Sequence, residues 1–240
     1  MTTDNQTYYD KFSSIYDDRR GAGYHAWLDA QQADLVRRSC PPGGRLLEVG
    51  CGTGLVLERL ASHFDETVGI DLSPGMLEKA SARGLDVHEA SVEALPFEDN
   101  SFDAVVSFKV LAHVDRIRTA ALEMVRVLKP GGICIAEFYN PRSVRGLIWA
   151  LKSPGRTASG EQHEKDVYYR FDTPVQARAY FPEDMEDAGA YGLRVLTPLP
   201  VFHKIPGVGA ALRSAEHVAA QWTPGLGSFY DLILRKPNSA

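Results

Sequence analysis

The sequence predicts an α/β fold, a three-layer sandwich in which a mostly parallel, seven-stranded sheet lies between two layers of helices. Short apolar runs alternate with amphipathic stretches over residues 44–138, which is the pattern of consecutive βαβ units. A glycine-rich turn follows the first apolar run, as expected where a strand ends at a ligand-binding edge. Two further apolar runs lie near the C-terminus, where the chain can fold back so that the second run pairs with the first. This predicts an antiparallel strand pair.

The individual elements follow from these patterns in chain order. A helical region comes first and ends at the Pro-Pro-Gly-Gly segment 41–44, because proline and glycine interrupt helices. We expect this region to cap the open edge of the sheet. The next strands are predicted over 45–49, 67–70, 85–90, 104–108 and 132–138, with helices over 53–63, 74–82 and 116–128. The remaining elements are helices over 142–152, 174–189 and 207–222 and strands over 193–202 and 228–235.

Composition narrows the class of protein. The chain has 240 residues with 44% hydrophobic and 24% charged side chains, which is typical of a globular domain and predicts a single domain over 1–240. Its formal charge of −5 disfavours nucleic acid as a partner. No run of 18 uncharged apolar residues occurs, so we expect no membrane span. Three cysteines without a CxxC pair predict a reducing, cytoplasmic location and no structural metal site.

The glycine-rich turn has the sequence Glu-Val-Gly-Cys-Gly-Thr-Gly at 48–54. Gly50, Gly52 and Gly54 leave no side chain between the backbone and a bound ligand, and Thr53 suits the N-cap of the following helix. The spacing GxGxG differs from the dinucleotide motif GxGxxG, and no P-loop lysine follows it. A phosphate group is therefore not the expected ligand.

Two carboxylates flank this turn. Glu48 lies two residues before Gly50 near the end of a core strand, where a buried carboxylate is costly unless a cation meets it. An ammonium group is its natural partner. Asp71 ends the second strand, 21 residues after Gly50, which is the distance at which an acidic side chain reaches a ribose diol. The pair predicts an adenosine ligand that carries a positive charge.

Five segments together resemble a known family. They lie at 48–54, 69–76, 93–107, 111–114 and 127–132, and the resemblance extends over about residues 8–140. In these segments the chain is similar to class I S-adenosylmethionine-dependent methyltransferases of the small-molecule type, such as ubiquinone/menaquinone C-methyltransferase-like enzymes. The resemblance implies a Rossmann-like sheet, S-adenosylmethionine as cofactor with S-adenosylhomocysteine as product, and a small-molecule methyl acceptor. Residues 1–43 would then form a cap, 44–140 the cofactor-binding core, and 141–240 the acceptor-side cover.

The resemblance also assigns cofactor contacts. Glu48 would attract the ammonium group, Asp71 would hold the ribose hydroxyls, and Leu72 and Met76 would pack on the adenine. Ser91 stands where an aspartate usually binds the adenine amino group, so we expect the Val92 backbone and Glu93 to share that role. The full set of expected cofactor-binding residues is Tyr9, Tyr16, Glu48, Gly50, Cys51, Gly52, Gly54, Asp71, Leu72, Met76, Ser91, Val92, Glu93 and Phe108.

The chemistry of the acceptor determines which residues are candidates for catalysis. A hydroxyl acceptor needs a general base, whereas an amine acceptor needs mainly to be neutral. His113 follows the fourth predicted strand and is the first candidate base, with Tyr16 second and His25, His163 and His203 behind them. The His163-Glu164 pair lacks the second histidine of a zinc-binding HExxH motif at position 167, so no metal is expected there.

The acceptor and two alternative functions stay open at this point. The segment after residue 138 is rich in aromatic residues, which favours an apolar or aromatic acceptor. The helix at 207–222 is expected to pack on the sheet or to form a lid. A non-catalytic protein that binds S-adenosylmethionine or another adenosine ligand is one alternative. A nicotinamide-dependent oxidoreductase is the other, and both Glu48 and the GxGxG spacing disfavour it.

Overall fold

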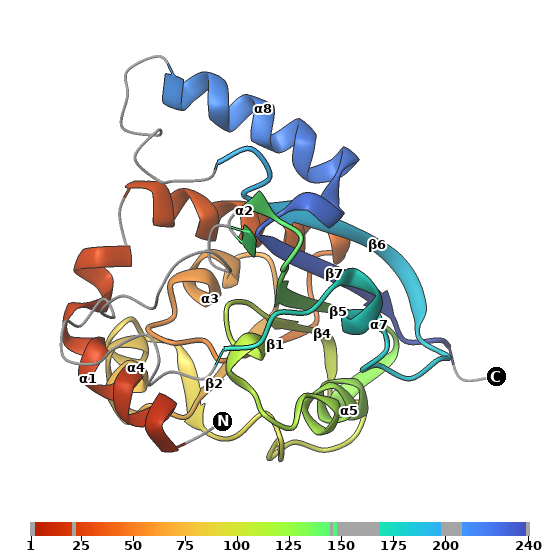
Figure 1. Cartoon of the computed structure of the whole chain (residues 1–240). Coiled ribbons are helices and arrows are strands. Elements are labelled where there is room, and N and C mark those ends of the chain that lie inside the picture. The colour runs from red at the N-terminus through yellow and green to blue at the C-terminus, as the bar shows by residue number, and fades with distance from the viewer. Residues whose placement is uncertain (1–2, 21–22, 145, 148–168, 198–207, 239–240) are drawn as a thin grey trace.

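A computed structural model describes residues 3–20, 23–144, 146–147, 169–197 and 208–238. Its centre is a seven-stranded sheet in the order β3-β2-β1-β4-β5-β7-β6 (Figure 1). The first five strands are parallel, whereas β7 runs antiparallel to both β5 and β6. The predicted sheet is thus confirmed. Its strands are β1 (Arg45–Val49), β2 (Glu66–Asp71), β3 (Asp86–Glu89), β4 (Phe102–Ser107), β5 (Leu128–Tyr139), β6 (Glu186–Leu193) and β7 (Phe229–Arg235).

Helices cover both faces of the sheet. Side chains alternate along β1, so Leu46 and Leu47 are both fully buried but belong to different apolar clusters. Figure 1 shows α2 and α3 on one side of the strands and α5 and α7 on the other. The described helices are α1 (Thr3–Arg20), α2 (Gly23–Ser39), α3 (Leu55–Leu60), α4 (Pro74–Ala82), α5 (Ile117–Val127), α7 (Pro174–Arg178) and α8 (Val208–Trp222), with short 3₁₀ turns at Leu111–His113 and Pro224–Leu226.

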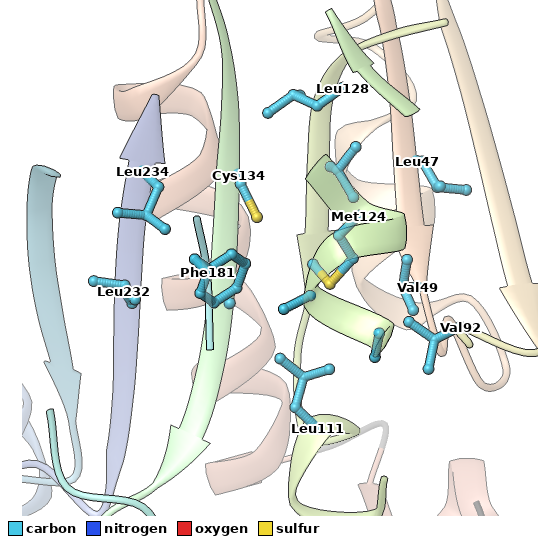
Figure 2. Packing of buried hydrophobic residues seen from close by; sticks show 14 of the residues in the cluster. Leu47, Val49, Val92, Leu111, Met124, Leu128, Cys134, Phe181, Leu232 and Leu234 are labelled. Carbon is cyan, nitrogen blue, oxygen red and sulfur yellow. The ribbon is translucent and has the colours of Figure 1, made fainter. Parts of the chain in front are cut away.

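Packing of α5 on the sheet follows from its apolar spacing. Ile117, Ala120, Met124 and Val127 recur at helical spacing and are all buried, so they form one face of the helix. Figure 2 shows Met124 of α5 close to Leu47 and Val49 of β1 and to Leu111. This cluster fixes the carboxyl end of β4, where the 3₁₀ turn Leu111–His113 follows.

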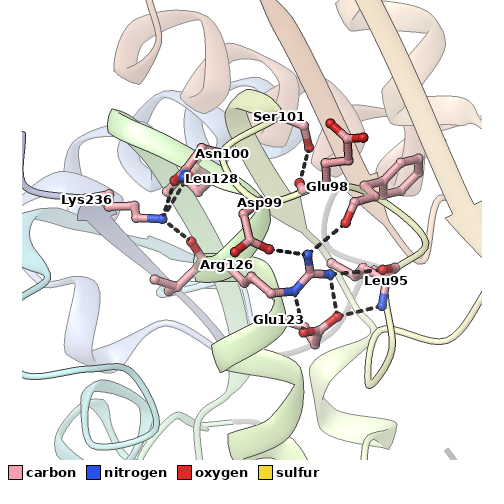
Figure 3. A network of polar contacts seen from close by, with 11 residues as sticks. Leu95, Glu98, Asp99, Asn100, Ser101, Glu123, Arg126, Leu128 and Lys236 are labelled. Atoms are coloured by element: carbon pink, nitrogen blue, oxygen red, sulfur yellow. Dashed lines mark hydrogen bonds and ion pairs between the residues drawn. The ribbon is translucent and has the colours of Figure 1, made fainter. Parts of the chain in front are cut away.

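A polar network holds the loop that leads from β3 to β4 (Figure 3). Arg126 of α5 donates to the backbone oxygens of Leu95 and Phe97, at 3.0 and 2.8 Å, and to Asp99. Glu123 accepts from Arg126 and from the Leu95 N–H at 2.8 Å. Several charge-assisted hydrogen bonds in one place restrain a segment that has no regular structure of its own. The network thereby positions the turn that immediately precedes Leu95.

The N-terminal helices differ from the predicted edge cap. Helix α2 packs beside α3 on a face of the sheet, and α1 lies against α4. The Asp10 carboxylate accepts hydrogen bonds from the Gly75 N–H (2.8 Å) and the Ser73 hydroxyl (3.1 Å), and Asp17 forms an ion pair with Arg83 (2.7 Å). These contacts hold α1 across the carboxyl ends of the strands rather than along an edge, because Ser73 and Gly75 directly follow β2.

The predictions for the C-terminal third are partly wrong. Within the helix predicted over 174–189, only α7 (Pro174–Arg178) is helical. The strand predicted over 193–202 begins too late, because β6 ends at Leu193 and residues 194–197 are not in a strand; residues 198–202 lie outside the described residues. Pro182 cannot donate a helical hydrogen bond, and the acidic residues that precede and open β6 are exposed on an edge strand. A polar edge strand lacks the apolar alternation that identifies a strand in a sequence.

Other predictions for this third have different outcomes. The strand over 228–235 and the helix over 207–222 correspond to β7 and α8, and α8 packs against β6. The predicted helix over 142–152 falls largely outside the described residues. No helix in the described part of the chain is long and apolar enough to cross a membrane.

Candidate functional site

A cavity of about 180 Å³ lies at the carboxyl ends of β1, β2 and β4, beneath α1. The topology places it at the point where the strand order reverses, between β1 and β4, which is where open α/β sheets bind ligands. Most of the sequence-predicted site residues line this one cavity. They are Tyr9, Tyr16, Glu48, Gly50, Cys51, Gly52, Asp71, Leu72, Met76, Ser91, Val92, Phe108 and His113. Gly54 and Glu93 do not line it.

The glycine turn brings bare backbone to the cavity. Gly50 and Gly52 have φ angles of 74° and 54°, a conformation that side-chain-bearing residues rarely adopt. A Cβ at Gly50 would lie 2.1 Å from the side chain of Val110, whereas a Cβ at Gly52 would meet no atom within 4 Å. Gly52 lines the cavity, so any side chain there would take up ligand space.

Two residues of the turn have structural roles that differ from those predicted. The N-cap of α3 is Gly54 rather than Thr53. The Thr53 hydroxyl instead donates to Asp17 at 2.6 Å and so ties α1 to the turn. A Cβ at Gly54 would lie 2.3 Å from Leu85. Gly54 therefore permits close packing behind the turn, and its predicted contact with the cofactor stays a prediction.

Glu48 presents an unpaired carboxylate oxygen. The residue is 3% exposed, and its Oε2 atom has no hydrogen-bond partner among the described residues. Burial raises the pKa of Glu48 to about 8, although the nearby Lys109 ammonium acts in the opposite direction. A buried carboxylate that lacks a partner is unfavourable until a cation or a proton reaches it. Glu48 therefore suits a positively charged group in the cavity.

Asp71 is held in place by the backbone. One of its carboxylate oxygens accepts from the Gly52 N–H and the other from the Ser73 N–H, both at 2.9 Å. Burial raises the pKa of Asp71, and these N–H donors oppose that rise. Each carboxylate oxygen keeps a further acceptor position. Asp71 can therefore receive two adjacent hydroxyl groups, as in a ribose.

The turn after β3 also borders the cavity. Ser91 and Val92 line the cavity, as does Met76 of α4, which is 2% exposed. The Ser91 hydroxyl accepts a hydrogen bond from the Glu93 N–H at 3.2 Å. Glu93 itself forms an ion pair with Arg116 at 2.7 Å and does not line the cavity. The share in ligand recognition predicted for Glu93 stays a prediction.

His113 lies at the end of the cavity nearest β5. Its Nε2 shares a hydrogen bond of 3.0 Å with the Tyr9 hydroxyl, and its ring centre is 4.7 Å from that of Tyr169 and 6.0 Å from that of Tyr139. Burial is the main cause of the raised pKa of Tyr9, so Tyr9 is a neutral phenol at neutral pH. Tyr9 and His113 together can accept one proton.

The other candidate bases have different positions. Tyr16 lines the cavity, with its ring centre 5.4 Å from that of Phe12. His25 does not line it and instead lies beside Arg20. The candidates His163 and His203 fall outside the described residues.

Sequence reasoning missed the charged residues around Lys109. This residue follows β4 with a φ of 63°, and its ammonium contacts Asp29 of α2 at 2.5 Å. Burial lowers the pKa of Lys109, but neighbouring carboxylates, Asp29 foremost, more than offset this and leave the pKa raised. Its backbone N–H donates to Glu137 of β5 at 2.9 Å. A lysine directly after an apolar strand was the available signal, but its acidic partners lie far away in the sequence. Arg20 of α1 also lines the cavity.

Comparison with known proteins gives a consistent result. A family model described as a methyltransferase domain matches residues 47–136. The chain is 43% identical over 103 residues to the demethylmenaquinone methyltransferase of Renibacterium salmoninarum, an alignment that covers 42% of this chain and 44% of that protein. It is 30% identical over 187 residues to the uncharacterized methyltransferase YodH of Bacillus subtilis, which covers 69% of this chain and 76% of that protein.

A solved structure shares the fold. It is a methyltransferase of Thermotoga maritima, titled a possible histamine N-methyltransferase, and it matches 96% of this chain and 99% of its own length with a TM-score of 0.67. The sequence identity is 20%, so this likeness shows the fold alone. In sequence, the chain spans less than half the length of the demethylmenaquinone methyltransferase that it matches.

Proposed function

The chain belongs to the class I S-adenosylmethionine-dependent methyltransferase family, and from this premise we propose that it methylates a small acceptor that contains an aromatic ring. The observation that carries the proposal is the pair of carboxylates at the cavity. Glu48 of β1 has a buried oxygen without a partner, and Asp71 of the neighbouring β2 is held by two backbone N–H groups. Their chemistry suits opposite ends of one positively charged nucleoside.

Each part of the cofactor has a matching set of residues. Glu48 would hold the ammonium group, and the backbone of Gly50, Cys51 and Gly52 would lie against the methionyl chain. Asp71 would accept hydrogen bonds from the two ribose hydroxyls. The adenine would lie between Met76 and the Ser91–Val92 turn. When bound, the cofactor supplies an electrophilic methyl group on a sulfonium ion.

The Tyr9–His113 pair would remove the proton of a hydroxyl acceptor. The Tyr9 oxygen accepts the acceptor's proton while Tyr9 passes its own proton to Nε2 of His113. The pair ends with one additional proton on the imidazole, and the acceptor oxygen becomes a stronger nucleophile. Helix α1 carries Tyr9 and covers the cavity, so it would also exclude water from the reacting groups. Tyr16, on the same helix, is proposed as a wall of the methyl-transfer space rather than as the base.

Aromatic residues favour a flat acceptor. Tyr139, Tyr169 and Phe229 line the cavity together with His113, and aromatic side chains provide a large contact area for a ring. The relative from Renibacterium salmoninarum is named for a quinone substrate, which supports an acceptor of the quinol type. As part of the same proposal we place the reaction in the cytoplasm, because all three cysteines are free and buried.

Calorimetry with S-adenosylmethionine, S-adenosylhomocysteine and NADH tests the cofactor directly. Both sulfur compounds should bind and NADH should not. The Asp71→Ala variant should bind S-adenosylhomocysteine about 1 to 3 kcal/mol more weakly, because it loses charge-assisted hydrogen bonds. Asp34→Ala is the matched control, since Asp34 pairs with Arg37 on the surface. Tight NADH binding without binding of S-adenosylmethionine would refute the proposal.

Transfer itself is measured with labelled S-adenosylmethionine and a panel of quinols and other phenols. Label should appear in the organic product in the presence of an acceptor. Cofactor binding without transfer to any compound of the panel would favour the non-catalytic alternative.

A further inference from the structure

The guanidinium group of Arg20 lies in the aromatic part of the cavity with few partners. Arg20 is the last residue of α1 and lines the cavity. Its Nη1 is 3.4 Å from Nδ1 of His25, a long and weak contact, and its Cζ lies 5.9 Å from the centre of the Tyr16 ring. No carboxylate in the described part of the chain forms an ion pair with it. Most of its five N–H donors are therefore available to a ligand.

The acidic residue that influences Arg20, Asp29, already has a partner. Asp29 is 3% exposed, and Lys109 contacts it at 2.5 Å. Asp29 is therefore already engaged by Lys109, and Arg20 has no ion-pair partner of its own among the described residues. A partly buried guanidinium without a counter-ion is unfavourable, and an anionic ligand group would correct this.

The surroundings of Arg20 differ from those of Glu48, the residue expected to hold the cofactor's ammonium group. The strongest charge interactions of Glu48 are with Lys109, Asp29 and Asp71. Arg20 lies beside the Tyr16 ring, and its pKa responds to Tyr16, Tyr139 and Tyr9 in their ionised forms and to Asp29. Tyr9 carries the hydrogen bond to His113. Arg20 thus belongs to the same end of the cavity as the residues proposed to receive the acceptor.

We propose that Arg20 forms a subsite for one anionic oxygen group of the acceptor, either a carboxylate or an acidic enol. This inference rests on the proposed function of the cavity and narrows its substrate class. The acceptor is a flat, hydroxylated ring, such as a quinol, that also carries a negatively charged group. Its anionic group meets Arg20, its ring lies among the tyrosines, and its hydroxyl lies at the Tyr9–His113 pair.

The geometry of a guanidinium group suits this role. Its planar fork of donors matches a carboxylate in two parallel hydrogen bonds, whereas a lysine ammonium acts as a point charge. The Tyr16 ring beside it provides a further attraction for the cation. Fixing the anionic group would orient the ring and bring its hydroxyl toward the methyl donor, which is how positioning contributes to rate.

Two matched probes test the subsite without knowledge of the natural acceptor. They are 1-hydroxy-2-naphthoate, which is anionic, and 1-naphthol, its neutral counterpart. Their binding to the protein saturated with S-adenosylhomocysteine is measured by calorimetry for the wild type, Arg20→Gln and Arg20→Lys. Arg37→Gln is the control, because Arg37 lies on the surface and pairs with Asp34. Affinity for S-adenosylhomocysteine alone is measured for every variant.

The wild type should bind the naphthoate at least about tenfold more tightly than naphthol, because its hydrogen bonds to Arg20 are charge-assisted. Arg20→Gln should remove this preference and leave the affinity for naphthol and S-adenosylhomocysteine within about twofold. Arg20→Lys should restore part of the preference, and Arg37→Gln should retain all of it.

Three results would overturn the subsite. The first is equal or absent binding of both probes by the wild type. The second is a preference that survives Arg20→Gln. The third is a loss of affinity for S-adenosylhomocysteine in Arg20→Gln with naphthoate binding intact, which would assign Arg20 to the cofactor carboxylate. Failure of the wild type to bind S-adenosylhomocysteine at all would instead refute the proposed function, so the two failures are distinguishable.

Discussion

The ionisation of Glu48 should make cofactor affinity depend on pH. Burial raises the pKa of this carboxyl to about 8 in the free protein, and a bound ammonium group would lower it because the charged form gains a partner. Only the ionised form binds well, and its fraction rises from about 1% at pH 6.0 to about 24% at pH 7.5. The affinity for S-adenosylhomocysteine should therefore increase roughly 20-fold over this range. We limit the prediction to pH 7.5 and below, because the amino group of the ligand loses its proton at higher pH.

Calorimetry in buffers of different ionisation enthalpy is the appropriate assay. At pH 7 close to one proton should be released per ligand bound, because about nine in ten Glu48 side chains are protonated beforehand. The Glu48→Gln variant should bind S-adenosylhomocysteine with an affinity that hardly changes with pH. This affinity should be similar to that of the wild type at pH 6 and lower than that of the wild type at pH 7.5. A wild-type affinity that does not change with pH, with no proton released, would refute the role assigned to Glu48.

Three further predictions concern catalysis, electrostatics and packing. His113→Gln should lower kcat by about 10²- to 10⁴-fold for a hydroxyl acceptor with S-adenosylhomocysteine affinity retained; an unchanged kcat in methyl-transfer assays would exclude His113 as the base. Burial, with Glu137 nearby, raises the pKa of Asp231, so the native state binds more protons than the unfolded state and stability falls as pH rises above the unfolded pKa. Asp231→Asn should therefore reduce this fall in the free energy of unfolding by up to about 1.4 kcal/mol per pH unit. Urea unfolding at pH 5, 6 and 7 would detect the difference, and the same pH dependence of stability in wild type and variant would contradict it. Met124 is fully buried under the sheet, so Met124→Ala should cost about 2 to 5 kcal/mol in urea unfolding, and a loss below about 1 kcal/mol would mean that the core closes over the missing side chain.

Local sequence patterns were sufficient to predict the strands and helices of the core. Strand β1 was predicted with its observed bounds, 45–49, because an apolar run that opens into glycines is a signal contained within one segment. Helix α5 was predicted within a residue or so, because its apolar face repeats over several turns. The strand at 186–193 was missed because β6 pairs only with β7 at the edge of the sheet, and an exposed edge strand leaves little apolar alternation to read.

The sequence by itself determined the part of the site that one βαβ unit contains. Glu48, the glycine turn and Asp71 lie within 24 residues of one another, and the parallel pairing of β1 with β2 necessarily brings their carboxyl ends to the same edge. No long-range information is needed for this arrangement, because strand, turn, helix and strand follow in direct succession.

Only the tertiary structure decided the acceptor end. The Tyr9–His113 hydrogen bond joins residues 104 positions apart, and the Lys109–Asp29 contact joins residues 80 positions apart. Both depend on how α1 and α2 pack against the finished sheet, and α1 shows little apolar periodicity to indicate which face it buries. Helix packing depends on the summed surfaces of distant elements, so the charge of Arg20 in the cavity became evident only once the chain was folded.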